Sequence, residues 1–360
     1  INAAATSDLN AWGQDSTGWL PIGTMGNPFA GKFDGLGHTV NSLFIYRTGA
    51  PLAGLFGQTK NTAIIRNVGL ANVYIRDFEN GSYTGGLVGL NNGSIYNSYV
   101  SGLVVASKPG PSGTSPAFGL GGLVGTNTGS ISNSYSASKV STLVANEIDN
   151  GASMVVGSFV GVNSGKIDLS YASGQFLSSA NPAFVGINSG IVTNSYWERK
   201  TSSSIGVLYS VAANSPVLGA NSNPLNQAAY DALDFGSIWT IYNGYTSPLL
   251  RSFLTPVNVQ VVSGGPKVYD ASSDYMAGSY SYIGTGSKNI FGTAKYSLDG
   301  ANAGSHELLL TGLYSDQQGY LISIKPASSL VIVTKRPLTI TANSASKTYG
   351  EANPSLSASV

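Results

Sequence analysis

A motif that recurs four times constrains this chain most strongly. Each copy has an apolar residue followed by glycine, then Asn-x-Gly, an apolar residue and a closing Ser-Tyr, and the copies occupy residues 86–99, 122–135, 158–171 and 183–196. The closing tyrosines are 36, 36 and 25 residues apart. A repeat of this period predicts stacked structural units, none of which can bury its apolar face alone.

The Asn-x-Gly step predicts where each unit turns. Asparagine tolerates a left-handed backbone, and glycine adopts a positive φ without a Cβ clash. The predicted corners are Asn91 and Gly93, Asn127 and Gly129, Asn163 and Gly165, and Asn188 and Gly190. We therefore expect an all-β, parallel β-helix whose coils lie about 4.8 Å apart, with like residues in lengthwise rows. Two such rows are Leu87, Leu123, Phe159 and Phe184, and Ile95, Ile131, Ile167 and Val192.

The closing tyrosines form a further predicted row, namely Tyr99, Tyr135, Tyr171 and Tyr196. Strand alternation places each tyrosine on the face of the Ile or Val four residues earlier, which favours packing in the interior. If they pointed outward, they would form an aromatic strip able to stack on sugar rings. The asparagine row is expected to be a hydrogen-bonded ladder at the corners rather than a ligand site.

Residues 1–202 are predicted to form the solenoid, beginning with coils that match the motif less well. In the first of these, Asp34-Gly35 predicts a turn between two strands. Residues 203–254 break the pattern and are expected to cap the open end of the last coil. This segment contains a predicted short helix at residues 226–234 and an apolar cluster around Trp239.

Residues 255–334 have longer alternating strands and Gly-rich turns, which predict an immunoglobulin-like β-sandwich. The sequence Lys267-Val-Tyr-Asp returns as Lys347-Thr-Tyr-Gly, so residues 335–360 are expected to begin a further module. The chain is therefore interpreted as a piece of a longer tandem array.

Composition restricts the partners of this chain. Only 10% of its 360 residues are charged and its formal net charge is +1, so no strong field would attract nucleic acid or an anionic membrane. No apolar run is long enough to suggest membrane insertion. Cysteine is absent, which excludes disulfides and thiolate metal sites. We expect no cofactor.

Three parts of the chain resemble known families. The copies within residues 85–196 resemble GLUG-motif repeats, residues 255–334 with Lys267-Val-Tyr-Asp resemble a YDG module, and residues 335–360 resemble the start of an MBG module. This combination is similar to filamentous-haemagglutinin-like bacterial adhesins of the two-partner secretion type. The resemblance implies a right-handed β-helix shaft, export with an outer-membrane secretion partner, and a secreted, cell-surface or extracellular-matrix location. It also implies roles in cell adhesion, aggregation through self-association, or biofilm formation.

Two other function classes are alternatives to this structural role. Loops inserted at residues 106–118 and 142–154 could bind extracellular polysaccharide or a host or neighbouring cell surface, because insertions at equivalent points lie on one side of a solenoid. A polysaccharide-degrading β-helix enzyme is the lesser alternative. It would need paired carboxylates, but Asp34, Asp77, Asp168 and Glu198 are expected at different repeat phases.

A zinc site is not expected. His306-Glu307 starts a His-Glu-x-x-His pattern, but Leu310 stands where the second histidine ligand is required. We therefore predict a non-catalytic chain without metal-binding or catalytic residues.

Overall fold

The computed structural model describes residues 1–8, 18–48, 51–78, 82–106, 118–142, 155–175, 184–199, 207–212, 215–283 and 289–360. The chain forms two compact units. The solenoid unit comprises Ile1–Thr255 together with Tyr314–Leu321, and the β-sheet unit comprises Pro256–Leu313 together with Ile322–Val360.

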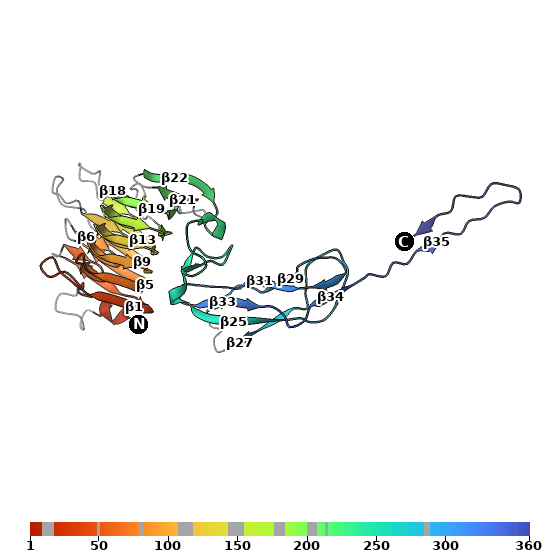
Figure 1. Ribbon diagram of the computed structural model, residues 1–360, viewed down its shortest axis with the longest axis horizontal. Coiled ribbons are helices and arrows are strands. Elements are labelled where there is room, and N and C mark those ends of the chain that lie inside the picture. Colours follow the sequence, from red (N-terminus) through yellow and green to blue (C-terminus); the bar gives the residue numbers. More distant parts are fainter. Residues whose placement is uncertain are drawn as a thin grey trace. The chain divides into compact units, whose positions relative to one another are not determined.

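The solenoid unit is built from parallel strands that stack coil upon coil (Figure 1). One sheet contains β3 (Leu52–Ala53), β6 (Tyr83–Gly85), β10 (Gly119–Gly121) and β14 (Val155–Gly157). A second contains β4 (Phe56–Gln58), β7 (Val88–Asn91), β11 (Val124–Asn127), β15 (Val160–Asn163) and β18 (Val185–Asn188). The predicted parallel β-helix is confirmed, and its handedness stays a prediction.

The largest sheet has two arms that share the long strand β5 (Ile64–Asp77). One arm contains β8 (Ser94–Tyr96), β12 (Ser130–Ser132), β16 (Lys166–Asp168) and β19 (Ile191–Thr193). The other contains β9 (Tyr99–Ala106), β13 (Tyr135–Thr142), β17 (Tyr171–Ala172) and β20 (Ser195–Arg199), and is extended by the antiparallel strands β21 (Val207–Ala212) and β22 (Ser215–Ser222). Strands β1 (Lys32–Asn41) and β2 (Phe44–Arg47) pair with β5 in parallel.

Equivalent apolar residues of successive coils lie in register and fill the interior of the solenoid. Ile95 pairs with Ile131, Ile131 with Ile167, and Ile167 with Val192, and all four are buried in one cluster. The row of Leu87, Leu123, Phe159 and Phe184 lies in the same cluster. The Phe159 and Phe184 rings stack with centroids 4.9 Å apart. Each coil therefore buries its apolar face only against its neighbours, as the repeat predicts.

The first coil differs from its prediction at Asp34-Gly35. Instead of a turn between two strands, β1 runs from Lys32 to Asn41 with an irregularity between Asp34 and His38. Leu36 and Gly37 have φ values of 52° and 75°, so the chain bends without reversing its direction. The Asp-Gly signal marks a bend within a parallel strand because both halves of β1 pair with β5.

The β-sheet unit contains small sheets around its own core. One sheet has the order β27 (Ser279–Ile283), β25 (Thr255–Val262) and β33 (Tyr320–Lys325), and another has β26 (Lys267–Val268), β34 (Val331–Thr334) and β30 (Gly304–His306). Val259 and Val261 of β25 share a buried cluster with Val331 and Val333 of β34. Two sheets thus enclose one core, as in a sandwich. The other strands of this unit are β28 (Ile290–Phe291), β29 (Lys295–Leu298), β31 (Leu308–Thr311), β35 (Thr341–Ala342) and β36 (Ala358–Ser359). The short strands β23 (Trp239–Thr240), β24 (Leu249–Leu250) and β32 (Tyr314–Ser315) belong to the solenoid unit.

Helical structure in the described residues is short. The 3₁₀ turns η1 (Ala4–Ser7), η2 (Gln227–Ala229) and η3 (Arg251–Phe253) have three or four residues each. The prediction of a helix over residues 226–234 was wrong, because only the three residues of η2 are helical there. The Asn226 side chain caps η2 by accepting a hydrogen bond from the Ala228 amide. None of the helical segments described has the length and apolar character needed to cross a bilayer.

Candidate functional site: stacked ladders and their covering segment

The corner asparagines form a buried ladder along the axis. Each Nδ2 donates to the Oδ1 of the next coil over 2.8 Å, in the order Asn91, Asn127, Asn163 and Asn188. The Thr59 hydroxyl donates to Asn91 Oδ1 over 2.8 Å and begins the series. Asn91, Asn127 and Asn163 have no exposed surface, so these amides satisfy one another where water is excluded.

The corner glycines are required by close packing rather than by backbone conformation. A Cβ on Gly129 would lie 2.0 Å from the Gly93 carbonyl oxygen, and one on Gly165 would lie 2.1 Å from the Gly129 carbonyl oxygen. A Cβ on Gly190 would meet the Gly165 carbonyl oxygen at 2.1 Å. None of these corner glycines has a positive φ. The predicted positive φ was therefore wrong, although the coils leave no room for any residue except glycine.

The left-handed residues occur six positions after each corner asparagine. Asn97, Asn133, Leu169 and Asn194 have φ values of 50°, 44°, 50° and 47°. Each precedes the Ser-Tyr pair, and the turn there changes which face of the coil the following residues occupy. Ser98, Ser134, Ser170 and Ser195 become buried and form a second ladder, in which each Oγ accepts the backbone N–H of the preceding coil's serine or, for Ser98, of Val68.

The serine ladder was missed in the sequence, although the invariant Ser before each Tyr was its signal. Each serine Oγ also donates to the carbonyl two residues earlier, as Ser134 does to Ser132 over 2.8 Å. Each hydroxyl thus binds a donor and an acceptor at a bend where both are buried.

The closing tyrosines are buried, as predicted, but the face that they were predicted to share with the Ile or Val four residues earlier was wrong. Tyr99, Tyr135, Tyr171 and Tyr196 belong to a cluster separate from the one that holds Ile95 and its row. The left-handed residue between the Ile and the Tyr interrupts the alternation on which that prediction depended. The rings stack lengthwise, with centroids 5.1 Å apart for Tyr99 and Tyr135 and 4.9 Å apart for Tyr135 and Tyr171.

Residues 223–253, here called the covering segment, bury this tyrosine ladder. Tyr230 contacts Tyr196 and Tyr171, with ring centroids 5.1 Å and 6.0 Å apart. Trp239 contacts Tyr171 and Tyr135. At the far end, the Phe253 ring lies edge-on to Tyr99 with centroids 4.9 Å apart. The covering segment therefore follows the side of four coils in reverse order. The strands β21 and β22, which also belong to the predicted cap at residues 203–254, extend the sheet beyond β20 of the last coil.

Each ladder hydroxyl binds a different part of the solenoid unit. Tyr99 shares a 2.9 Å bond with Thr39 of β1, Tyr171 donates to the Pro248 carbonyl, and Tyr196 donates to Asp231. Tyr135 donates to Gln317 Oε1 over 3.0 Å. The four phenols thus fix β1, the covering segment at two points, and Gln317 against one face.

Gln317 joins the ladder to the covering segment. Its Oε1 also accepts from the Leu250 amide over 2.7 Å, and its Nε2 donates to the Leu250 carbonyl over 2.8 Å. Gln317 is only 8% exposed. One side chain thus satisfies three buried polar groups, in a pattern that no local sequence signal predicts.

The buried phenols are held in their neutral form. Burial raises the pKa of Tyr99 to about 12. Burial also raises the pKa of Tyr135 and Tyr171 well above the usual value, and the neighbouring phenols add to the effect for Tyr135. Neutral phenols act here as hydrogen-bond donors and packing surface.

Asp34 and Asp168 share one repeat phase, so their predicted separation into different phases was wrong. The row runs Asp34, Arg66, Tyr96, Ser132, Asp168 and Thr193 in register. Four coil steps separate the two carboxylates, roughly 19 Å. A glycosidase pair must lie much closer, within about 10 Å.

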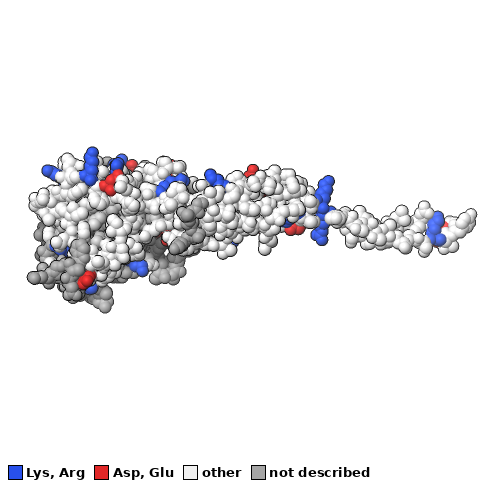
Figure 2. Space-filling view, turned by 90° about the horizontal axis from the view of Figure 1, so that it is seen from below, with Lys and Arg blue, Asp and Glu red and all other residues white. Residues whose placement is uncertain are grey.

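Each of these carboxylates is bound within its own coils. The pKa of Asp34 is lowered by a side-chain hydrogen bond from Asn67, a backbone hydrogen bond from Leu36 and the ion pair with Arg66 at 2.8 Å. Partial burial opposes the ionisation of Asp168, but bonds from Thr193, Lys166 and Asn194 outweigh it and lower its pKa. On the face of the molecule in Figure 2, charged side chains are few and scattered.

His306 is occupied within the β-sheet unit. Its Nδ1 lies 2.8 Å from Asp299 Oδ1 and its Nε2 lies 2.7 Å from the Asn302 carbonyl oxygen. Among the residues that the structure describes, no group of three or more His, Cys, Asp or Glu side chains is arranged to hold a metal ion. The loops predicted to contact glycans, residues 106–118 and 142–154, lie outside the described residues except for residues 106, 118 and 142 at their ends.

Comparison with known proteins identifies part of the repeat. Residues 117–141 match the GLUG motif, which confirms that part of the sequence resemblance. A stretch of 110 residues, 30% of this chain, is 34% identical to Halomucin of Haloquadratum walsbyi, of which it covers 1%. A stretch of 80 residues, 22% of this chain, is 38% identical to a protein of Evansella cellulosilytica described as a Gly-rich membrane protein, of which it covers 9%. No solved structure matches.

Proposed function

We propose that this chain is a non-catalytic structural segment of a secreted bacterial surface adhesin, in which the solenoid serves as a stiff shaft. The observation that carries the proposal is the set of continuous ladders of asparagine, serine and tyrosine along the axis. Bonds directed along the axis resist bending and separation of coils, and this property suits a spacer that holds a binding region away from a cell.

The wider assignment depends on the resemblances. The GLUG match and the likeness to Halomucin support an extracellular repeat protein. The YDG-like and MBG-like sequences support the filamentous-haemagglutinin type, with two-partner secretion and attachment or biofilm formation as its role. Extracellular polysaccharide, another cell surface or another copy of the chain would then be its partner.

The shaft role can be tested in cells that produce the whole protein. A variant that breaks the asparagine ladder, Asn127→Ala with Gly129→Ala, should abolish surface attachment or aggregation because the coils no longer stack. A variant with Asp34→Asn and Asp168→Asn removes two carboxylates from the outer row and should leave attachment unchanged. Thermal unfolding of both variants verifies that the second keeps its fold and loses much less stability than the first, since it gives up only the charges of partly exposed carboxylates.

Two results would contradict the proposal. One is attachment that persists after the ladder variant is shown to be unfolded. The other is cleavage of a polysaccharide by the purified chain that the Asp34→Asn, Asp168→Asn variant lacks, because that result would identify an enzyme.

A further inference from the structure

One outer surface of the solenoid combines aromatic and basic side chains. It consists of two rows in register across β2, β5, β9 and β13, here called the aromatic face. The rows are Phe44, Tyr74, Leu103 and Lys139, and Tyr46, Arg76, Val105 and Ser141. Ile45, Ile75, Val104 and Val140 lie between the rows along each strand and are fully buried in the interior, so alternation directs both rows away from it. Val105 in the second row is itself only 6% exposed, so the other members of the rows form the accessible surface.

The aromatic rings of this face are ordered by contact with one another. The Phe44 and Tyr74 rings are nearly parallel, with centroids 5.5 Å apart. Tyr46 packs against Phe78, the residue immediately after β5, with centroids 5.0 Å apart. Tyr74 remains 37% exposed. Rigid rings lose little entropy when a ligand binds, so such a surface suits recognition.

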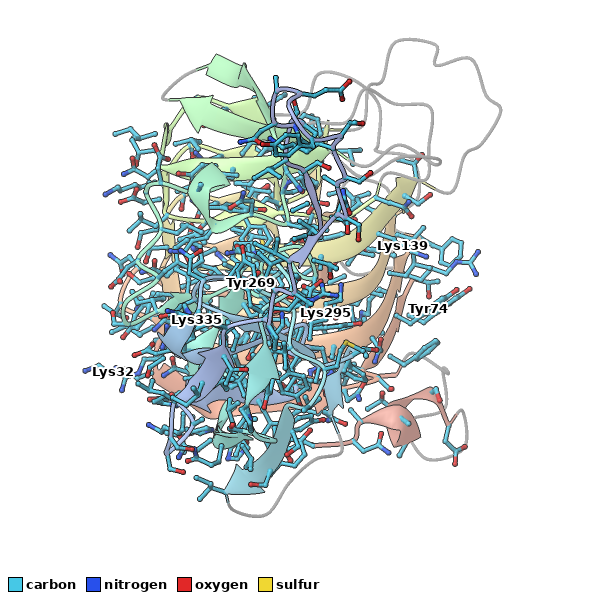
Figure 3. The ribbon with its side chains drawn as sticks, turned by 90° about the vertical axis from the view of Figure 1, so that its right-hand side faces the viewer. Lys32, Tyr74, Lys139, Tyr269, Lys295 and Lys335 are labelled. Carbon is cyan, nitrogen blue, oxygen red and sulfur yellow. The ribbon has the colours of Figure 1, made fainter. Side chains whose placement is uncertain are left out.

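The charges of this face are basic. The Arg76 guanidinium lies 4.6 Å from the centre of the Phe78 ring, which holds it in place by a cation–π contact. Lys139 is exposed two coils from Tyr74, and Figure 3 shows both side chains on the same side of the solenoid. Neither row contains a carboxylate, and Asp77 beside Arg76 is fully buried and accepts a bond from Thr84.

We propose that the aromatic face binds an anionic polysaccharide, such as a chain of uronic acids. Tyrosine and phenylalanine rings would contact the C–H faces and edges of the sugars, and Arg76 and Lys139 would bind their carboxylates. The rows repeat at about 4.8 Å per coil, so a linear polymer can meet equivalent positions on successive coils.

The face fits this occupant better than nucleic acid. Two cations on a chain of net charge +1 supply little of the phosphate neutralisation that nucleic-acid binding needs. The proposal goes beyond the shaft role. It also differs from the loop-based glycan site, because it uses only strand residues.

The test measures binding of the full chain to alginate, a polyuronate, with dextran as a neutral polysaccharide and a DNA duplex as a second polyanion. Arg76→Gln with Lys139→Gln should weaken alginate binding about tenfold, since two ion pairs are lost. Lys32→Gln with Lys295→Gln removes the same charge from exposed positions outside the face and should change binding less than about twofold. Figure 3 shows Lys32 on the opposite side of the solenoid from Lys139.

A second variant separates the aromatic contribution from the charge. Tyr74→Ala should weaken alginate binding about fivefold without changing its dependence on salt. Thermal unfolding of every variant verifies the fold. The proposal is overturned if alginate binds the two double variants equally, if dextran binds as tightly as alginate, or if the DNA duplex binds more tightly than alginate. Failure here would leave the shaft role intact, because that role is measured through ladder variants.

Discussion

Replacing Gln317 with alanine should release the covering segment from the tyrosine ladder. The change leaves three groups without their partner, the Tyr135 hydroxyl and the amide and carbonyl of Leu250. A buried polar group that loses its partner costs about 1–3 kcal/mol. Because Gln317 is 8% exposed, water can reach part of the gap. We therefore expect the three groups together to lower stability by about 3 kcal/mol, the lower limit of their summed cost.

Hydrogen exchange measured by mass spectrometry can localise this effect. A loss of about 3 kcal/mol corresponds to roughly a hundredfold faster exchange wherever opening of the covering segment limits protection. Amides of residues 223–253 should therefore exchange faster in Gln317→Ala, while those of the interior strands β7 and β11 keep their protection. Gln318→Ala is the matched control because Gln318 is the exposed neighbour.

The result that would refute this reasoning is equal exchange in Gln317→Ala and Gln318→Ala. A double-mutant cycle gives a further check. Tyr135→Phe alone should cost about 1 kcal/mol, since Gln317 Oε1 keeps its bond from Leu250. The same change in the Gln317→Ala background should cost less, because the hydroxyl has then already lost its acceptor.

The remaining predictions concern the ladders. Asn127→Ala should lower the free energy of unfolding by about 3 kcal/mol, because the amides of Asn91 and Asn163 each lose a buried partner; urea unfolding measures this, and a change below about 0.5 kcal/mol would contradict it. Gly129→Ala should destabilise at least as much, because its Cβ would lie 2.0 Å from a carbonyl oxygen; a stabilised variant would disprove the close packing. Stability should fall above pH 10. The pKa of Tyr99 in the folded state, about 12, exceeds its ordinary value of 10.0, so the folded state keeps this proton to a higher pH than the unfolded state does. The resulting contribution to the free energy of unfolding is fully present below pH 10 and is lost as the pH rises toward 12. Urea midpoints measured against pH with phenolate absorbance would test this, and a midpoint independent of pH over that range would count against it.

The rows of the interior could be predicted because they depend only on the repeat. A fixed offset of 36 or 25 residues places Ile95, Ile131, Ile167 and Val192 in register whatever the details of each coil. The strands of the β-sheet unit likewise follow their period of two, as in β25 and β34, whose Val259, Val261, Val331 and Val333 share one core. Patterns that depend on chain spacing and side-chain alternation are local, and the sequence contains them fully.

The face that each tyrosine occupies depends on one backbone angle that composition does not reveal. Leu169 adopts φ = 50° at the position where the other clear copies have asparagine, so the bend is imposed by the coil and not by the residue type. Alternation counted through that bend places Tyr171 in the wrong cluster.

The same bend explains why the covering segment exists. Because it turns four large aromatic rings away from the interior, it leaves an apolar strip on the side of the solenoid that the coils themselves cannot bury. A segment from outside the repeat must cover this strip, and Tyr230, Trp239 and Phe253 are spaced along residues 223–253 to reach successive coils. The tyrosine at the end of each copy is therefore the part of the repeat that specifies a contact with non-repeat sequence, whereas the asparagine and serine specify the next coil. Interior coils and covering segment are thus encoded by different residues of one motif, and substitutions at the two kinds of position should open different parts of the molecule.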